Sequence, residues 1–230
     1  MPSTLITGAN RGLGLELVQQ YAAQGWDVIA CCREPGTAVA LNDLASAHSG
    51  IEVHALDVSD AEAVVALAQF LTGRTIDLLI LNAGVLGDDC ASLGALTQDK
   101  LLRVMNINTV APALMIQAFA EHVAAGDKKL IVGMSSILGS IAGNSDGGLY
   151  SYRASKAGLN AVLRSAAMDL RDRGITVLAM HPGWVQTDMG GEGAQITTEQ
   201  SVTGMLQVIE GATNSDSGSF VTYDGSGLPW

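Results

Sequence analysis

The chain has 230 residues, of which 48% are hydrophobic and 15% are charged, so it can bury a sizeable core as one domain spanning residues 1–230. Its formal net charge of −11 argues against a nucleic acid or an anionic membrane surface as a partner. The sequence lacks an apolar run of about 18 residues, the length that predicts a transmembrane helix. Three cysteines, two of them adjacent at Cys31 and Cys32, do not suggest a disulfide framework. With no signal-peptide pattern at the N-terminus, a cytoplasmic protein is expected.

Short apolar runs alternate with longer helical patterns along the whole chain. The runs predict strands at 3–7, 27–32, 52–56, 78–81, 129–134, 176–181 and 219–222. Helices are predicted near 13–24, 37–48, 60–72, 98–125, 151–173 and 198–211. The central runs are apolar without alternation, which is typical of parallel strands buried on both faces. We therefore predict an α/β fold, a three-layer doubly wound Rossmann fold with a mainly parallel seven-stranded sheet.

A glycine-rich loop, TGANRGLG at residues 7–14, follows the first predicted strand directly. Gly8, Gly12 and Gly14 permit a tight turn and a close approach of the backbone to a ligand. The helix predicted next would present free N–H groups and the positive end of its dipole to a pyrophosphate. The loop therefore predicts a dinucleotide site, although its glycine spacing differs from the commoner G-x-G-x-x-G pattern.

The end of the second predicted strand bears on the choice of dinucleotide, because an acidic residue there normally binds the ribose of NAD(H). This chain has Cys32 and Arg33 at that point, and a cation suits the 2′-phosphate of NADP(H). Arg11, in the glycine loop, is a second candidate for the same phosphate. Glu34 is a candidate for the ribose hydroxyls, so NADP(H) is favoured while NAD(H) stays open. Asp57, which ends the third strand, either meets the adenine edge or caps the next turn.

A tyrosine and a lysine lie four residues apart in the run YRASK, at Tyr152 and Lys156. On a helix this spacing places both side chains on one face. A phenol ordinarily has a pKa near 10, and a neighbouring ammonium lowers that pKa because it favours the phenolate. Tyr152 is therefore expected to serve as a general acid or base near neutral pH.

Seven motifs, in this order, resemble the short-chain dehydrogenase/reductase family in its compact single-domain form. They are TGANRGLG at 7–14, LDV at 56–58, NAG at 82–84, MNINTVAP at 105–112, MSS at 134–136, YRASK at 152–156 and HPGWVQT at 181–187. The runs SSILGSIAGNSDGGLYSYRASK and HPGWVQTDMGG resemble most closely the C-factor and sniffer type of carbonyl reductase. The resemblance covers essentially the whole chain.

The resemblance implies a catalytic set of four residues. Ser136 would orient a substrate carbonyl, and Tyr152 would donate or accept the proton. Lys156 would bind the nicotinamide ribose and lower the pKa of Tyr152, while Asn108 would hold a water that relays protons to Lys156. The predicted cofactor-binding residues are Gly8, Asn10, Arg11, Gly12, Leu13, Gly14, Arg33, Asp57, Val58, Asn82, Ala83, Gly84, Tyr152, Lys156, Pro182, Gly183, Val185 and Thr187.

The asparagine assignment requires a choice between Asn106 and Asn108. In the family this asparagine is followed, three residues on, by a small residue, and Asn108 has Ala111 at that place. Asn106 is then expected to be a surface or capping residue.

The spacing of Ser136 and Tyr152 is longer than is usual in the family. It predicts a three-residue insertion around residues 144–148, which would change the rim of the pocket. Tyr150 is not a substitute, because only Tyr152 has a lysine four residues on. Ser135 remains a rival for the serine role.

Apolar residues are predicted to form the rim of the substrate site. Leu138, Trp184 and Met189, with the loop at 190–200, suit an aldehyde, ketone or quinone with a hydrophobic body, and they join Ser136 and Tyr152 as the predicted substrate-binding residues. The sequence has neither an HExxH nor a CxxC pattern, so no metal site is predicted. The histidines and Cys90 are expected to be packed or solvated.

An NADPH-dependent carbonyl reductase acting on a small-molecule substrate is the leading functional hypothesis. The alternatives are an NAD-dependent alcohol dehydrogenase and, from another class, a C-factor-like dinucleotide-binding signalling protein. Ser136, Tyr152 and Lys156 argue against a purely binding role, because binding alone needs no activated phenol. In the family, the helix from 151 and the one near 100–122 often pair across a two-fold axis, so a homodimer is expected, with a homotetramer second.

Overall fold

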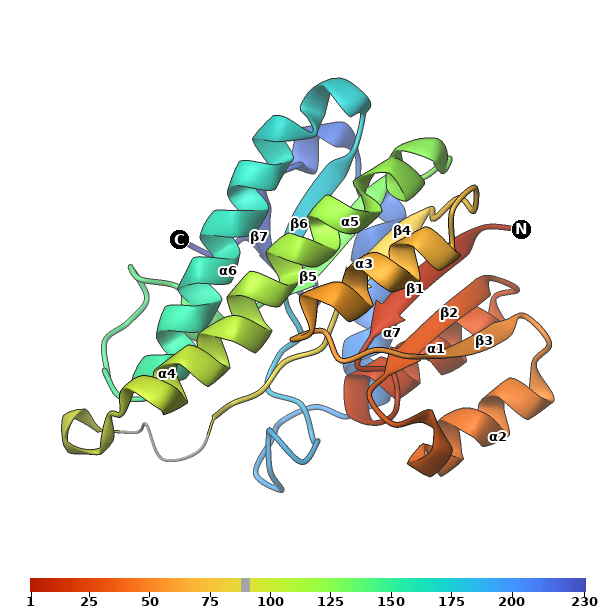
Figure 1. Ribbon diagram of the computed structural model, residues 1–230. Coiled ribbons are helices and arrows are strands. Elements are labelled where there is room, and N and C mark those ends of the chain that lie inside the picture. Colours follow the sequence, from red (N-terminus) through yellow and green to blue (C-terminus); the bar gives the residue numbers. More distant parts are fainter. Residues whose placement is uncertain (88–91) are drawn as a thin grey trace.

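Seven strands form one sheet in a computed structural model that describes residues 1–87 and 92–230 (Figure 1). The strands are β1 Ser3–Thr7, β2 Asp27–Cys32, β3 Ile51–Ala55, β4 Leu78–Leu81, β5 Leu130–Met134, β6 Thr176–His181 and β7 Ser219–Thr222. Their order is β3-β2-β1-β4-β5-β6-β7, and every neighbouring pair is parallel. The predicted doubly wound α/β fold is therefore confirmed.

Helices cover both faces of the sheet (Figure 1). They are α1 Gly12–Ala23, α2 Val39–Ala47, α3 Ala61–Phe70, α4 Gln98–Met105, α5 Ala111–Ala125, α6 Tyr150–Asp169 and α7 Thr198–Gly211. One buried apolar cluster joins the sheet to α3, α5 and α6, and a second joins the opposite face to α1, α2 and α7. No helix in the described ranges is long and apolar enough to span a membrane.

The strand predictions were accurate because buried parallel strands give uninterrupted apolar runs. Five of the seven match the structure at both ends, and β3 begins and ends one residue earlier than predicted. The run at 129–134 begins one residue too early, because Lys129 has a φ of 51°. That left-handed backbone does not continue a strand, so β5 starts at Leu130.

The long helix predicted over 98–125 is interrupted, and this prediction was wrong in detail. A turn of π-helix, Asn106–Val110, separates α4 from α5. Pro112 has no N–H, so it cannot donate the usual helical hydrogen bond to the carbonyl of Asn108. The side chain of Asn108 meanwhile bonds to residues outside the helix. Both features stabilise the wider turn, which is the ordinary setting of a π-bulge.

The chain enters α6 through three successive left-handed residues. Gly147, Gly148 and Leu149 have φ values of 66°, 65° and 44°. Leucine disfavours this conformation, so the entry to the helix is held under backbone strain. Gly147 and Gly148 fall within the insertion predicted around residues 144–148, and Leu149 follows it directly. At its other end α6 stops at Asp169, and a short 3₁₀ turn, Arg171–Arg173, completes the predicted helix.

Candidate active site

The predicted site residues gather at the carboxyl ends of the central strands. The glycine loop follows β1, Asn82 follows β4, Ser136 follows β5 and Pro182 follows β6. Tyr152 lies in the first turns of α6. The buried face of this helix packs on the face of the sheet that α3 and α5 also cover. In an open parallel sheet, ligands bind at this edge, where the strand order reverses. Here that switch point lies between β1 and β4.

The glycine loop has the geometry of an anion cradle. Gly8 and Gly12 have φ values of 67° and 53°, which side-chain-bearing residues rarely adopt. A Cβ on Gly14 would collide with the carbonyl oxygen of Gly8. Helix α1 begins here with no side-chain cap and no acidic residue in its first turn. Its first N–H groups and its positive dipole end therefore suit a pyrophosphate.

Two polar side chains hold the glycine loop against β4. The amide of Asn82 donates to the carbonyl oxygens of Thr7 and Gly8, at 2.9 and 3.2 Å. The Thr7 hydroxyl accepts hydrogen bonds from the backbone N–H groups of Asn82 and Ala83, each at 3.0 Å. Asn82 therefore fixes the loop from the neighbouring strand and keeps its shape without a ligand.

The two candidate phosphate-binding arginines have different surroundings. Arg11 forms an ion pair with Asp188, on the loop that follows β6, and both side chains are exposed. Arg33 is exposed and lies close enough to Asp57 to lower the pKa of that carboxyl, although hydrogen bonds from Ser59 have the larger effect. Asp57 accepts from the Ser59 N–H at 2.9 Å and from its hydroxyl at 2.6 Å. Two roles were predicted for Asp57, contact with the adenine edge or capping of the next turn, and the structure shows the second.

Ser136, Tyr152 and Lys156 form one buried group. All three side chains are less than 9% exposed. The Ser136 hydroxyl lies close enough to the Tyr152 phenol to lower the pKa of that phenol, and its oxygen accepts the Leu138 N–H at 3.2 Å. Lys156 Nζ lies 5.7 Å from the centre of the Tyr152 ring and donates to the carbonyl oxygen of Met134 at 2.7 Å. The longer spacing between Ser136 and Tyr152 therefore does not separate them.

The prediction that Lys156 lowers the pKa of Tyr152 is not met in this structure. Burial raises the pKa of Tyr152, and the neighbouring Ser136 hydroxyl offsets only part of that effect. Burial also lowers the pKa of Lys156 to about 8. The reason is that desolvation disfavours both charged forms, the phenolate and the ammonium. The phenol is therefore a proton donor at neutral pH, not a ready base.

Asn108 connects three elements around the site. Its side-chain oxygen accepts the Val85 N–H at 2.9 Å, and its amide donates to the Val85 carbonyl at 2.8 Å and to the Ser155 hydroxyl at 3.0 Å. A Cβ placed on Gly84 would lie 3.3 Å from the Asn108 oxygen and 3.5 Å from Lys156 Nζ. The structure thus brings Asn108 next to Lys156, and the water relay stays a prediction. Asn106 is exposed, as expected.

Ser135, the rival serine, has a different partner. Its hydroxyl donates to the Asn160 side chain at 2.5 Å, and both residues are buried. Asn160 in turn donates to the Gly139 carbonyl at 3.4 Å. Through Asn160, Ser135 is therefore connected to the turn that follows Ser136. Of the two serines, only Ser136 affects the pKa of Tyr152.

The loop after β6, which is predicted to meet the nicotinamide, lies against the glycine loop. Thr187 lies against the glycine loop, since a Cβ on Gly12 would be 3.4 Å from its methyl group. The Trp184 indole N–H donates to the Gly190 carbonyl at 2.8 Å, which folds the loop back on itself. Val185 is buried, and its bridge to Ile196 anchors the returning strand of the loop.

The apolar side chains predicted to form a substrate rim differ in their exposure. Trp184 and Met189 are exposed, and Leu138 is half-buried. Sequence reasoning missed Ile137 and Ile141, which are exposed on the segment between Ser136 and α6. The sequence did contain a hint of them, because both lie within three residues of Leu138 in an apolar stretch that is too short to be a strand.

Three polar partners of the site were also missed. Ser155 and Asn160 interrupt the apolar stripe of α6, and such interruptions in a core-facing pattern indicate buried hydrogen bonds. Asp188 gave no sequence signal, because its contact with Arg11 joins residues from opposite ends of the chain. Cys90, expected to be unreactive, lies outside the described residues.

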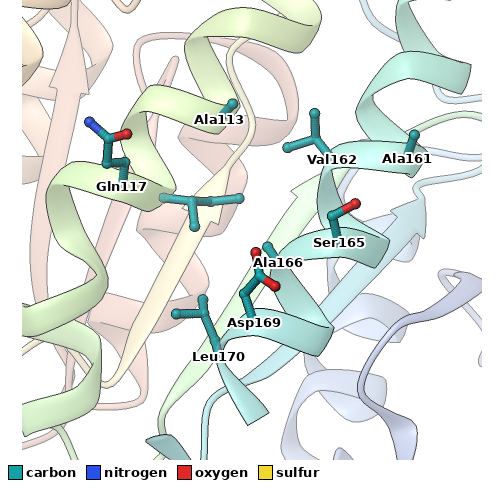
Figure 2. Close-up of a pocket in the computed structure, with 9 residues that line it drawn as sticks. Ala113, Gln117, Ala161, Val162, Ser165, Ala166, Asp169 and Leu170 are labelled. Atoms are coloured by element: carbon teal, nitrogen blue, oxygen red, sulfur yellow. The ribbon is translucent and has the colours of Figure 1, made fainter. Parts of the chain in front are cut away.

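A groove of about 450 Å³ lies away from these residues, between α5 and α6. Figure 2 shows Ala113 and Gln117 on one wall and Ala161, Val162 and Ser165 on the other. Its lining is mostly small and apolar, and it contains none of the catalytic candidates. The groove therefore belongs to a surface distinct from the site.

Comparison with known proteins places these features in a family. The profile of the short chain dehydrogenase family matches residues 3–196. The C-signal protein of Myxococcus xanthus is 43% identical over 155 residues, which cover 67% of this chain and 93% of that protein.

Two solved structures share the whole fold. The carbonyl reductase Sniffer of D. melanogaster is 36% identical, with a TM-score of 0.92 over 100% of both chains. An NADPH-bound carbonyl reductase from chicken fatty liver has the same identity and TM-score over 100% of this chain and 99% of its own. The chain is thus an oxidoreductase structurally close to carbonyl reductases, and it belongs to the short chain dehydrogenase family.

Proposed function

We propose that the protein is an NADPH-dependent carbonyl reductase that acts on an aldehyde or ketone with a hydrophobic body. The observation that carries this proposal is the buried group of Ser136, Tyr152 and Lys156 at the same edge of the sheet as the glycine loop. A buried phenol close to a serine hydroxyl offers two donors to one carbonyl oxygen. A role in binding alone would not require this arrangement.

The protein would supply the polar half of a hydride transfer. A bound nicotinamide supplies or accepts the hydride. Ser136 and Tyr152 would donate to the carbonyl oxygen, and fixed donors stabilise the negative charge that develops there. Tyr152, whose pKa is raised by burial, is protonated at neutral pH and can deliver its proton. Lys156 would move from the Met134 carbonyl to the ribose hydroxyls.

The glycine loop and the two arginines support NADP(H) over NAD(H). Arg33 stands where NAD(H)-specific sites carry an acid, and Arg11 lies at the start of α1. A cation favours a 2′-phosphate through charge-assisted hydrogen bonds. The NADPH-bound neighbour supports the same choice.

A comparison of dissociation constants for NADPH and NADH tests the cofactor assignment, and a panel of carbonyl compounds monitored by NADPH absorbance tests the reaction. NADPH should bind at least about tenfold more tightly than NADH, and Arg33→Ser should weaken NADPH binding by about tenfold while NADH binding is unchanged. Equal or tighter binding of NADH would contradict the role given to Arg33. A wild-type protein that turns over no carbonyl would contradict the reductase assignment.

We further propose a homodimer in which α5 and α6 of two copies pair across a two-fold axis. The groove between these helices supports this, because its small side chains allow close helix approach. Light scattering should give a dimer mass for the wild type. Ala161→Arg should produce monomers, whereas Ala40→Arg on exposed α2 should not. A monomeric wild type, or a dimer that survives Ala161→Arg, would exclude this interface.

A further inference from the structure

The segment between Ser136 and α6 carries the apolar rim but forms mostly local turns. Its backbone bonds include Gly139 N–H to Ser136 at 2.8 Å, Ser140 N–H to Ile137 at 3.0 Å and Asn144 N–H to Ile141 at 3.3 Å. Turns of this kind fix the shape of a loop but not its position relative to the rest of the fold. The position depends on contacts with other segments.

Trp230 supplies two of those contacts. Its carbonyl oxygen accepts the Ala142 N–H at 3.0 Å and the Ser140 hydroxyl at 3.5 Å. Ser140 is only 2% exposed, and its oxygen also accepts the Gly143 N–H at 2.9 Å. Trp230, although distant in the sequence, therefore contacts the middle of the segment between Ser136 and α6 and helps to fix its position.

The tail that carries Trp230 is itself fixed to the sheet. After β7 the chain reverses, with the Thr222 N–H donating to Ser226 at 2.8 Å, and the Leu228 N–H donates to the Phe220 carbonyl at 2.8 Å. The side chain of Leu228 packs against the core cluster under α6. The Trp230 ring stacks on Phe220 with centroids 5.4 Å apart and an interplanar angle of 25°. Figure 1 shows this end of the chain beside α6, next to the loop that leads into it.

We infer that Trp230 is a positioning residue for the substrate side of the active site. It couples β7, through the ring stack and the two hydrogen bonds, to the segment that follows Ser136 and carries Ile137, Leu138 and Ile141. This inference rests on the proposed reductase function and adds which residue sets the width of the substrate opening. The cofactor side, built from the glycine loop and the segment after β6, makes no contact of this kind with Trp230.

The consequence is a selective effect on large substrates. If Trp230 only contributed to stability, its loss would lower activity with every substrate alike. If it positions the rim, its loss should weaken binding of substrates long enough to reach Ile137 and Ile141. A small aliphatic aldehyde, which contacts only Ser136 and Tyr152, should be spared.

The test compares Trp230→Ala with Trp230→Phe, which keeps an aromatic ring over Phe220. In Trp230→Ala the KM of a bulky aromatic ketone should rise about tenfold, as expected for the loss of an aromatic pair. The KM of a small aldehyde and the Kd of NADPH should stay within about twofold. Trp230→Phe should restore most of the loss. A matched control is Phe70→Ala, which removes an exposed ring tilted against His54 at the opposite edge of the sheet and should change none of these constants.

Amide hydrogen exchange gives a readout that does not depend on activity. Trp230→Ala should accelerate exchange at Ala142 and Gly143 by about tenfold, and exchange in α7 should be unchanged. Unchanged exchange at these amides, or an equal rise in KM for large and small substrates, would overturn the inference. If the wild type reduces no carbonyl, the proposed function fails, while the exchange result still decides whether Trp230 holds the segment.

Discussion

Burial of Lys156 controls how the site should respond to pH. Its lowered pKa, about 8, means that the free protein loses this charge well before an exposed lysine would. The pKa of Tyr152 is raised, so the phenol keeps its proton over the same range. Reduction needs both a protonated Tyr152 and a charged Lys156, so Lys156 sets the alkaline limit.

We therefore expect kcat/KM for carbonyl reduction to be flat near neutral pH and to fall above about pH 8. The measurement is a profile of kcat/KM with NADPH from about pH 6 to pH 10. Lys156→Arg, although slower, should lose the inflection because a guanidinium stays protonated. A wild-type rate of reduction that rises between neutral and alkaline pH would contradict this assignment.

Asp188 should act as an internal competitor of the cofactor. It pairs with Arg11, a predicted ligand of the 2′-phosphate, and the pair is exposed, so it contributes less than about 1 kcal/mol. Asp188→Asn should tighten NADPH binding by about twofold to fivefold and leave NADH unchanged, because NADH has no 2′-phosphate. Glu192→Gln, the same charge change on the same loop, is the control. Equal tightening of NADPH and NADH binding in Asp188→Asn would show a general effect of charge, not competition for Arg11.

The sequence was sufficient to predict that Tyr152 and Lys156 belong to the site, but not the directions in which their pKa values shift. Tyr152 and Lys156 share a helix face because of their spacing, and that could be predicted. The direction of their pKa shifts depends mainly on burial, which is set by the packing of α6 against other elements of the fold. The Arg11–Asp188 pair depends on contact between the loop after β1 and the loop after β6, and no local pattern encodes such a contact.

Among the elements, strands were easier to predict than helix interruptions. An apolar run such as 78–81 specifies a buried strand by itself. The π turn at Asn106–Val110 depends on Asn108 bonding to Val85 and Ser155, which belong to other elements. Only Pro112 gave a local hint, and proline is tolerated in the first turn of a helix as well.

Asp77 joins three elements at the edge of the sheet opposite the site. Its carboxylate accepts the N–H groups of Ser3 at 2.7 Å, Asp127 at 2.7 Å and Lys128 at 3.3 Å. Burial raises the pKa of Asp77, but these hydrogen bonds outweigh it and leave the pKa below its ordinary value. The ionised form therefore stabilises the junction of β1, β4 and the turn before β5.

Asp77→Asn should lower the free energy of unfolding at pH 7 by about 1–3 kcal/mol, because the amide replaces an acceptor oxygen with a donor. A depressed pKa contributes stability above the ordinary aspartate range, and this contribution is lost as the pH falls through the folded value. The deficit, measured by urea denaturation, should therefore shrink below about pH 4. Asp43→Asn, on exposed α2, should have little effect at either pH. Equal stability of Asp77→Asn and wild type at pH 7 would contradict this role.

Acid stability of the whole molecule should depend on His181. This residue ends β6 opposite Thr222 of β7. Burial lowers its pKa to about 4, and the nearby Asp224 opposes that effect only weakly. The folded pKa lies below the unfolded value of about 6.5, so the unfolded chain binds the proton first as the pH falls.

The free energy of unfolding should thus decrease between about pH 6.5 and pH 4, by at most about 3 kcal/mol from this residue. His181→Gln cannot take up that proton, so its stability should fall less over the same range. Urea denaturation at several pH values measures the difference between the two proteins. Parallel curves for wild type and His181→Gln would show that the histidine is not held neutral by the fold.

At the scale of the whole molecule, the fold brings donors from several strands and helices to one edge of the sheet. We propose that Tyr152 delivers the proton there. Tyr152→Phe removes one hydroxyl from a buried ring and should leave the fold and the glycine loop in place.

The most direct measurement compares turnover of a carbonyl substrate by wild type and Tyr152→Phe, with NADPH affinity determined for both. We predict that kcat falls by about 10²–10⁴-fold while the Kd of NADPH changes by no more than about twofold. A Tyr152→Phe protein that keeps full turnover would contradict the account.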